Sequence, residues 1–256
     1  MIANYHTHTE RCLHATGSEE DYIRCAIQSG IQILGFSDHT PYPFPNGYRS
    51  PVRMLPEQLS EYAQTLQNLK KQYASQIQLH VGLEVEYYPA LFKELMQRIR
   101  DTDVEYMLLG QHWVGNEQNE PKCILPTGDE SVIRRYCAQA RDAMQTGLFT
   151  YFAHPDVINY TGNPKTYASY MRTLCQEANR CQLPLELNLL GRRGNYHYPN
   201  PRFWEIAAEE NCKVIIGCDA HEPQALTDTA TEEQMIAFAN RFHLHVSQTV
   251  PLRSIH

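Results

Sequence analysis

The sequence has 256 residues, enough for one large α/β barrel domain or for two small domains. No shift in composition, internal repeat or low-complexity tract marks a boundary, so we predict a single domain over residues 1–256. The formal net charge of −7 and the pI of about 5.9 argue against a protein that binds polymeric nucleic acid through a broad cationic surface, although a small basic pocket is compatible with them.

The first elements alternate between extended and helical patterns. The apolar run at 1–6 predicts a strand, the segment at 18–30 has helical periodicity, and β-forming residues return at 31–39. Ser18 is the expected N-cap of this helix, since acidic residues follow it, and Gly30 is its expected end.

The same alternation continues along the chain. Further strands are predicted at 77–87, 104–112, 148–155, 184–188 and 213–221. Helices are predicted near 56–74, 89–100, 129–146, 164–180 and 200–210. About seven β-α units result, which favours parallel strands with crossover helices, either closed into a barrel or opened as a doubly wound sheet.

Polar residues that suit metal or acid-base chemistry occur at the carboxyl ends of nearly all the predicted strands. They are His6, His8, Asp38, His39, Glu84, Glu86, His112, His154, Asn188, Asp219 and His221. In a (β/α) barrel these ends meet at one active-site mouth, whereas a doubly wound sheet spreads them along an open line. The even distribution therefore favours the barrel.

His6 and His8 are one residue apart in a predicted strand, so their side chains share a face and could hold one ion. The alternative is an ordinary polar strand face. Imidazoles and carboxylates together are typical of a catalytic Zn²⁺, Mn²⁺ or Fe²⁺ site, whereas a structural zinc site would use closely spaced cysteines. This donor set weakens a second alternative, a metal-stabilised binding module without catalysis.

Seven motifs occur in order between about residue 4 and residue 221: HTHT, HATGSEEDYI, GFSDHTP, GLEVEY, GQHWV, AHPD and GCDAH. Together they closely resemble the PHP (polymerase and histidinol phosphatase) superfamily, and GFSDHTP and HATGSEEDYI are most similar to its histidinol-phosphate phosphatase branch. The resemblance implies a distorted (β/α)₇ TIM-like barrel, which agrees with the seven units counted above.

The resemblance also implies three divalent metal ions, which could be Zn, Mn or Fe. The first ion would be held by His6, His8, Glu84 and Asp219. Glu84 would bridge to a second ion held by His112 and His154, and the third would be held by His14, His39 and His221. No ligand position is missing, which argues against an inactive member of the family.

The activity that the resemblance implies is metal-dependent hydrolysis of a phosphomonoester, L-histidinol phosphate, through attack by a metal-bridging hydroxide. Three divalent ions outweigh the charge of the two ligand carboxylates and one hydroxide, which suits a phosphate dianion. Asp219 would either protonate the leaving alkoxide or act only as a ligand. The alternative substrates are other phosphate esters: nucleotides, sugar phosphates or phosphodiesters. A polymerase-linked exonuclease is disfavoured because no basic tract accompanies the site.

The segment at 188–199 brings basic residues to the expected mouth. Arg193 matches the family's phosphate-contacting arginine and Arg192 matches it less well, and an exposed loop arginine is the alternative for both. His197 is a weaker candidate for substrate binding. Asn159 stands where some relatives have a further basic residue.

The remaining polar segments have simpler interpretations. The aromatic and proline-rich stretch at 40–51 is expected to be a long loop, either a mobile lid and substrate wall or a packed rim. His80 lies before the end of its strand and is expected to be a packed or surface residue. His243, His245 and His256 follow the last motif and are expected to be solvent-exposed.

The start of the sequence, MIANYHTH, lacks the basic and apolar regions of a signal peptide, and no apolar run approaches the roughly 20 residues that cross a bilayer. We therefore expect a cytoplasmic protein without a membrane partner. The eight cysteines are scattered and include no C-x-x-C pair, so we expect reduced thiols that mostly pack. The sequence does not indicate an oligomeric state.

Overall fold

The computed structural model describes residues 1–118, 120 and 122–255. In this part of the chain, eight parallel strands form one sheet in chain order, from β1 to β8. The strands are β1 Ala3–Asn4, β2 Ile33–Phe36, β3 Gln78–Val85, β4 Tyr106–Gly110, β5 Phe149–Ala153, β6 Leu185–Asn188, β7 Lys213–Gly217 and β8 His245–Ser247.

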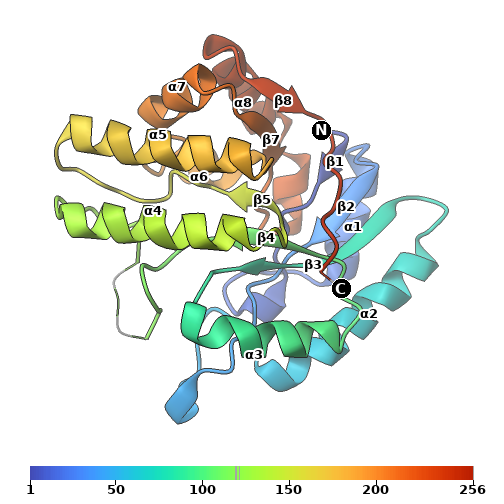
Figure 1. The fold of residues 1–256 in the computed structure, drawn as a ribbon. Helices are drawn as coiled ribbons and strands as arrows, with labels where there is room; N and C mark the ends of the chain where they lie inside the picture. The colour runs from blue at the N-terminus through green and yellow to red at the C-terminus, as the bar shows by residue number, and fades with distance from the viewer. Residues whose placement is uncertain (119, 121, 256) are drawn as a thin grey trace.

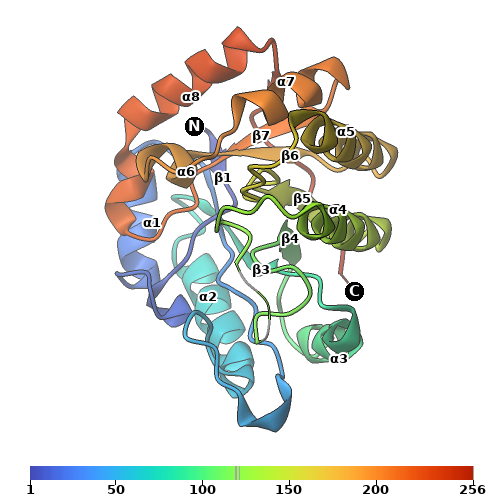
Figure 2. The same ribbon diagram turned by 90° about the vertical axis from the view of Figure 1, so that its left-hand side faces the viewer.

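Helices follow the strands and surround the curled sheet (Figures 1 and 2). They are α1 Glu19–Gln28, α2 Leu59–Gln72, α3 Pro89–Arg100, α4 Glu130–Gln145, α5 Pro164–Arg180, α6 Leu189–Arg193, α7 Pro201–Glu209 and α8 Thr229–Arg241. Short 3₁₀ turns add η1 Glu10–Cys12, η2 Pro45–Gly47, η3 Pro56–Gln58 and η4 Pro223–Thr227. The distorted TIM-like barrel that the sequence predicts is confirmed.

The barrel closes between the segments that follow β1 and β7 at its carboxyl end, but not between β1 and β7 themselves. At the carboxyl ends of the strands, the amide of His8 donates to the carbonyl of Ala220 at 2.8 Å, and the amide of Ala220 donates to the carbonyl of His6 at 3.2 Å. At the amino ends, β8 pairs with β7 instead. The sequence analysis did not anticipate β8 or α8, because β8 has only three residues and α8 buries only Thr231, Met235 and Ala239.

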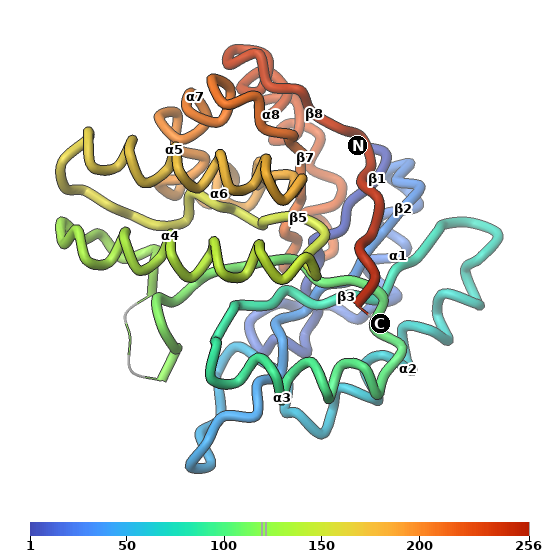
Figure 3. Tube along the Cα trace, in the orientation of Figure 1, coloured from blue at the N-terminus to red at the C-terminus, as the bar shows by residue number. Residues whose placement is uncertain are grey.

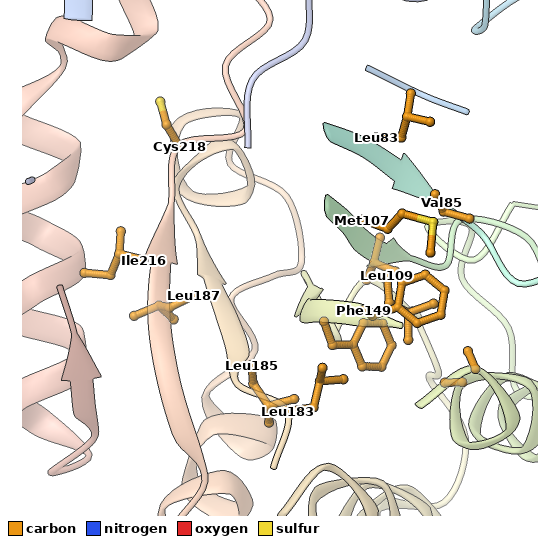
Figure 4. Close-up of a cluster of buried hydrophobic side chains, with 14 of the residues drawn as sticks. Leu83, Val85, Met107, Leu109, Phe149, Leu183, Leu185, Leu187, Ile216 and Cys218 are labelled. Atoms are coloured by element: carbon orange, nitrogen blue, oxygen red, sulfur yellow. The ribbon is translucent and has the colours of Figure 1, made fainter. Parts of the chain in front are cut away.

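The side chains of the strands alternate between the two faces of the barrel wall. Met107 and Leu109 point outward from β4 to the helices, where they meet Val85 and Phe149 of the neighbouring strands (Figure 4). Leu108, between them, points inward and packs in a separate interior cluster. Because both faces are buried, these strands are apolar except where a polar side chain enters the barrel.

The interior cluster forms an apolar layer below the predicted site. It consists of Ala3, Tyr5, Tyr106, Leu108, Tyr151, Ala153, Ile215 and Val250. Tyr106 fits because a Cβ at Gly82 would lie 2.3 Å from its ring, and its hydroxyl donates to the carbonyl of Tyr5 at 2.6 Å. Val250 belongs to the C-terminal segment, which runs from β8 past the N-terminus toward β3 (Figure 3).

Helix α1 begins and ends as predicted. The Ser18 hydroxyl accepts from the amide of Asp21, the Asp21 carboxylate accepts from the amide of Ser18, and Gly30 has a positive φ of 75°. The amide of Thr16 donates to the carbonyl of His221 at 2.9 Å. The loop before α1, which carries His14, is thereby attached to the end of β7.

The first part of the segment at 40–51 packs against the barrel as a rim, whereas Pro45–Gly47, Arg49 and Pro51 are exposed. Tyr42 is buried, with its ring centroid 4.7 Å from that of Tyr88, and Phe44 packs beside both. The cysteines are free thiols, six of them buried. A search of the described residues finds no helix with the length and hydropathy needed to cross a membrane.

Candidate metal centre

The first ligand cluster contains the two histidines that follow β1. Their Nε2 atoms are 3.1 Å apart. Glu84 Oε2 lies 3.6 Å from His6 Nε2 and 3.4 Å from His8 Nε2, and Asp219 Oδ1 lies 3.4 and 3.3 Å from the same atoms. Four atoms about 2.0–2.1 Å from one tetrahedral ion would be separated by about 3.3–3.4 Å, so this spacing fits a metal ion.

The second cluster contains the other oxygen of the same glutamate. Glu84 Oε1 lies 2.8 Å from His154 Nε2 and 3.6 Å from His112 Nε2. Glu84 projects inward from β3 toward the end of β4, where Gly110 leaves room for it, since a Cβ there would lie 2.0 Å from Oε1. One carboxylate therefore faces two ligand sets.

The third cluster contains His14, His39 and His221, whose ligand atoms lie within 4.8 Å of one another. The Nε2 atoms of His14 and His221 are 3.0 Å apart. His39 Nδ1 lies 3.0 Å from Glu84 Oε2, yet neither atom has a hydrogen-bond partner among the described residues. The three clusters are therefore adjacent.

Acceptors at Nδ1 orient the imidazole rings in all three clusters. His6 Nδ1 lies 2.8 Å from Glu186 Oε1, and His112 Nδ1 lies 2.8 Å from Glu86 Oε1. His14 Nδ1 lies 2.7 Å from the carbonyl of Cys12, and His221 Nδ1 lies 3.2 Å from the carbonyl of Asp219. Carbonyls and carboxylates only accept, so the proton belongs on Nδ1 and the Nε2 lone pair is left for a ligand bond.

This arrangement is a direct test of whether a metal fits. With protons on both Nδ1 atoms, the lone pairs of His14 and His221 face each other at 3.0 Å, and a cation between them would turn repulsion into coordination. The buried and unpartnered Glu84 Oε2 supports the same conclusion. The donor set of imidazoles and carboxylates fits Zn²⁺, Mn²⁺ or Fe²⁺.

The protonation states of His8 and of the two carboxylates suit metal binding. Burial and the nearby His221 together lower the pKa of His8 to about 3, although Asp219 and Glu84 oppose them, so His8 is neutral at pH 7. Burial alone would lower the pKa of His6, but Asp219, Glu186 and Glu84 outweigh it and raise that pKa well above its usual value, so an ion would have to displace a proton from His6. Burial alone would raise the pKa of Glu84, but His112, His6 and His39 outweigh it and hold that pKa well below its usual value. His6 and His8 likewise hold the pKa of Asp219 low against its burial. Both carboxylates are therefore charged.

Two polar networks hold the ligands from behind. Asn188 Nδ2 donates to Glu186 Oε2 at 2.8 Å and to Asp219 Oδ2 at 3.0 Å. Glu86 Oε1 lies 2.8 Å from Nη2 of Arg53, whose Nε donates to Glu117 Oε2 at 2.7 Å. Arg53 is 2% exposed and Glu86 fully buried, so this is an internal ion-pair network.

Asp38 has a different position from the one expected at the mouth. Its carboxylate accepts from the amide of Thr9 at 2.8 Å and from the hydroxyl of Thr9 at 3.0 Å. Burial raises the pKa of Asp38 to about 7. This residue fixes the chain directly after His8 rather than lining the cavity.

A cavity of about 480 Å³ opens above the ligand clusters. Ligands His14, His39, Glu84, His112, Asp219 and His221 line it, and Trp113, Lys122, Ile124, Val157, Leu190, Tyr196 and Tyr198 form its outer wall with Val52. Val52 comes from the end of the rim segment. The candidate metal ligands therefore lie at the base of one partly aromatic mouth.

The predicted substrate-binding arginines do not line this mouth. Arg193 Nη2 donates to the carbonyl of Cys218 at 3.1 Å, and its Nη1 lies 3.7 Å from Asp228 Oδ2. Arg192 Nε donates to Gln234 at 2.9 Å, in a separate hollow beside α8. Both residues lie on α6, where the sequence analysis expected a loop.

The other histidines lie outside the clusters. His197 is half-buried, with Nε2 2.9 Å from the carbonyl of Val157. His80 is half-buried near Glu105, and His243 and His245 are exposed, as expected. His256 lies outside the described residues.

Sequence reasoning missed Glu186, Arg53, Glu117 and Lys122. Glu186 had a usable signal, because it is the one acid between two buried leucines in β6 and must therefore point into the barrel. The other three lie in irregular segments, whose periodicity does not define a facing direction.

Comparison with known proteins identifies the family of this chain. The PHP domain model matches residues 4–189. A "Probable histidinol-phosphatase" of Deinococcus radiodurans is 28% identical over 228 residues, which cover 87% of each chain. The "Histidinol-phosphatase" of Bacillus subtilis is 27% identical over 248 residues, which cover 85% of this chain and 92% of the relative.

Solved structures show the same fold. A histidinol phosphate phosphatase from Lactococcus lactis, complexed with zinc, L-histidinol and phosphate, superposes with a TM-score of 0.72 at 17% identity, covering 99% of this chain and 97% of that one. A second structure, from Listeria monocytogenes, gives 0.73 at 16% identity, covering 87% and 96%. Since the domain model spans more than half of the sequence, the chain belongs to the PHP domain family.

Proposed function

We propose that this protein is a metal-dependent phosphomonoesterase that hydrolyses L-histidinol phosphate to L-histidinol and phosphate. The observation that carries the proposal is the single carboxylate, Glu84, that faces two histidine clusters at the base of one cavity, with a third cluster beside it. The curated relatives named histidinol-phosphatase support the choice of substrate.

In this proposal three divalent ions occupy the three clusters. When bound, the ions supply Lewis acidity, which lowers the pKa of water and stabilises charge on the phosphoryl oxygens. Glu84 would provide a ligand oxygen to two of them, since its two oxygens face different histidine clusters. The Oδ1 atom of Asp219 faces His6 and His8 while its Oδ2 accepts from Asn188, which supports a ligand role over proton donation to the leaving group.

The domain organisation, the location and the substrate class in this proposal are taken from the sequence predictions. Residues 1–256 act as one domain, in the cytoplasm, on a small phosphate ester and not on polymeric nucleic acid. Phosphate binding by Arg193 or Arg192, and substrate contact by His197, require these side chains to leave their present partners. The alternative substrates are nucleotides, sugar phosphates and phosphodiesters.

The test is phosphate release by purified protein loaded separately with Zn²⁺, Mn²⁺ or Fe²⁺. L-histidinol phosphate is compared with a panel of the alternative esters, and the Glu84→Gln variant controls for contaminating phosphatase. We expect the highest kcat/KM for L-histidinol phosphate. A higher value for another ester would replace the substrate, and no hydrolysis of any ester by metal-loaded protein would favour a binding module.

A further inference from the structure

The outer wall of the mouth contains one positively charged side chain, Lys122, that forms no ion pair with a described residue. Among the described residues lining the cavity, Lys122 is the only lysine or arginine. No described carboxylate forms an ion pair with it, and the nearby Glu120 pairs with Arg135 instead, at 2.6 Å. Its Nζ lies 5.3 Å from the centroid of the Trp113 ring.

The backbone around Lys122 is attached to the metal centre. Lys122 pairs with Trp113 in an antiparallel bridge, and the amide of Cys123 donates to the carbonyl of the ligand His112 at 2.7 Å. On the other side, the Asn159 side chain donates to the carbonyl of Ile124 at 3.2 Å. The backbone of Lys122 is therefore anchored beside the second ligand cluster, while its side chain is exposed.

The other cations near the site are already engaged. Arg53 is buried between Glu86 and Glu117. Arg193 donates from Nη2 to the carbonyl of Cys218, and its Nη1, which has no hydrogen-bond partner among the described residues, lies 3.7 Å from Asp228 Oδ2. Arg192 bonds Gln234 outside the mouth. Lys122 is thus the cation that can reach a ligand in the cavity without breaking an existing ion pair.

We propose that Lys122 binds the phosphate group of the substrate by donating a charge-assisted hydrogen bond to a non-bridging oxygen. An ammonium group is a compact charge with three donors, and its contact with the Trp113 ring leaves those donors available to an anion in the cavity. The inference rests on the proposed phosphomonoesterase function and adds a binding residue to it. No proton transfer is required of the lysine.

The experiment compares Lys122→Met, which keeps an unbranched apolar stem, with Lys122→Arg, which keeps the charge. Binding of inorganic phosphate to the metal-loaded protein is measured by calorimetry, together with KM, kcat and metal content. Lys165→Met is the matched control, because Lys165 is exposed on α5 and does not line the mouth. We expect Lys122→Met to weaken phosphate binding and raise KM by roughly tenfold or more, with metal content unchanged.

Lys122→Arg and Lys165→Met should each stay within about threefold of the wild type. Unchanged phosphate affinity in Lys122→Met, or no phosphate binding by the wild type, would overturn the inference. Phosphate binding is measured without turnover, so failure to hydrolyse L-histidinol phosphate would count against the proposed function while the role of Lys122 is still decided.

Discussion

The carboxylate of Glu84, which faces two histidine clusters, depends on a neighbour that has no side chain. A Cβ at position 110 would lie 2.0 Å from Glu84 Oε1, and a Cβ at Gly217 would lie 1.8 Å from Oε1 of Glu186. Both glycines lie on the strand next to the glutamate they accommodate. Their role is to leave space for a charged group inside the barrel.

We expect Gly110→Ala to displace the Glu84 carboxylate, which should lower both metal content and turnover at least tenfold, while overpacking costs about 1–3 kcal/mol of stability. Metal analysis, steady-state kinetics and urea unfolding measure the three effects. Gly128→Ala is the control, because a Cβ there meets no atom within 4 Å. Full metal content with normal turnover in Gly110→Ala would show that the carboxylate has another way to fit.

His6 and His8 offer a second prediction at this scale. Because both Nε2 atoms face the same two carboxylates, His6→Ala and His8→Ala should each lower metal content and reduce turnover by at least a hundredfold. The double variant should lose little more, since ligands of one ion act as a unit. Metal analysis and turnover for the three variants decide it, and additive losses with metal retained would indicate independent packing roles.

Arg53 connects the rim segment to the metal centre, at the scale of elements. It follows the loop at 40–51, and its guanidinium contacts the carbonyl of Thr40, Glu86 and Glu117. Glu86 in turn orients His112. The rim segment is therefore connected to the second ligand cluster through Arg53 and Glu86.

Arg53→Met should destabilise the protein by about 3–5 kcal/mol, because it leaves two buried carboxylates without their cation. It should also weaken binding of one ion by about 10–100-fold through the freed His112 ring. Urea unfolding and chelator competition measure these effects. Arg172→Met, which removes an exposed pair with Glu209 and Glu210, should leave both stability and metal affinity close to those of the wild type. If Arg53→Met loses stability but keeps full metal affinity, Arg53 stabilises the fold without orienting His112.

The predictability of the site differs between its base and its wall. Strand periodicity and the β-α alternation place most of the candidate ligands at one end of a barrel, whereas His14 and the grouping into three clusters are predicted only from the resemblance to the PHP family. The wall could not be placed from the sequence, because it consists of irregular segments. The arginines illustrate this: Asn188 Oδ1 accepts from the amide of Gly191 at 3.0 Å and starts α6, which turns Arg192 and Arg193 away from the mouth.

At the scale of the whole molecule, function and part of the stability lie at opposite ends of the barrel. The ligands gather at the carboxyl ends of the strands. At the amino end of β4, Glu105 accepts from His80 Nδ1 at 2.8 Å and pairs with Lys70 of α2. Burial alone would raise the pKa of Glu105, but His80 and Lys70 outweigh it and lower that pKa to about 2.

A lowered pKa in the folded state means that Glu105 contributes stability above about pH 4.5 and loses it as the pH falls toward about 2. The unfolding free energy of the wild type should exceed that of Glu105→Gln by about 1–2 kcal/mol at pH 7, and the difference should shrink across this window. Urea unfolding at pH 7, 4 and 3 measures it. Glu94→Gln, from an exposed pair with Arg98, should differ from the wild type by under about 0.5 kcal/mol throughout. A constant gap for Glu105→Gln would contradict the assignment.

The closure of the barrel at the ends of β1 and β7 has a consequence for how the protein matures. The first ligand cluster takes His6 and His8 from the beginning of the chain and Asp219 from near its end, and the same short stretches carry the hydrogen bonds between His8, Ala220 and His6. Joining them requires closing a loop that contains most of the sequence, whose entropic cost must be met before the contacts form. The donors of the second cluster, Glu84, His112 and His154, all precede β6, whereas the first cluster is complete only when Asp219 joins the opening histidines. The first cluster therefore depends on the whole barrel, and the second depends on its first five strands.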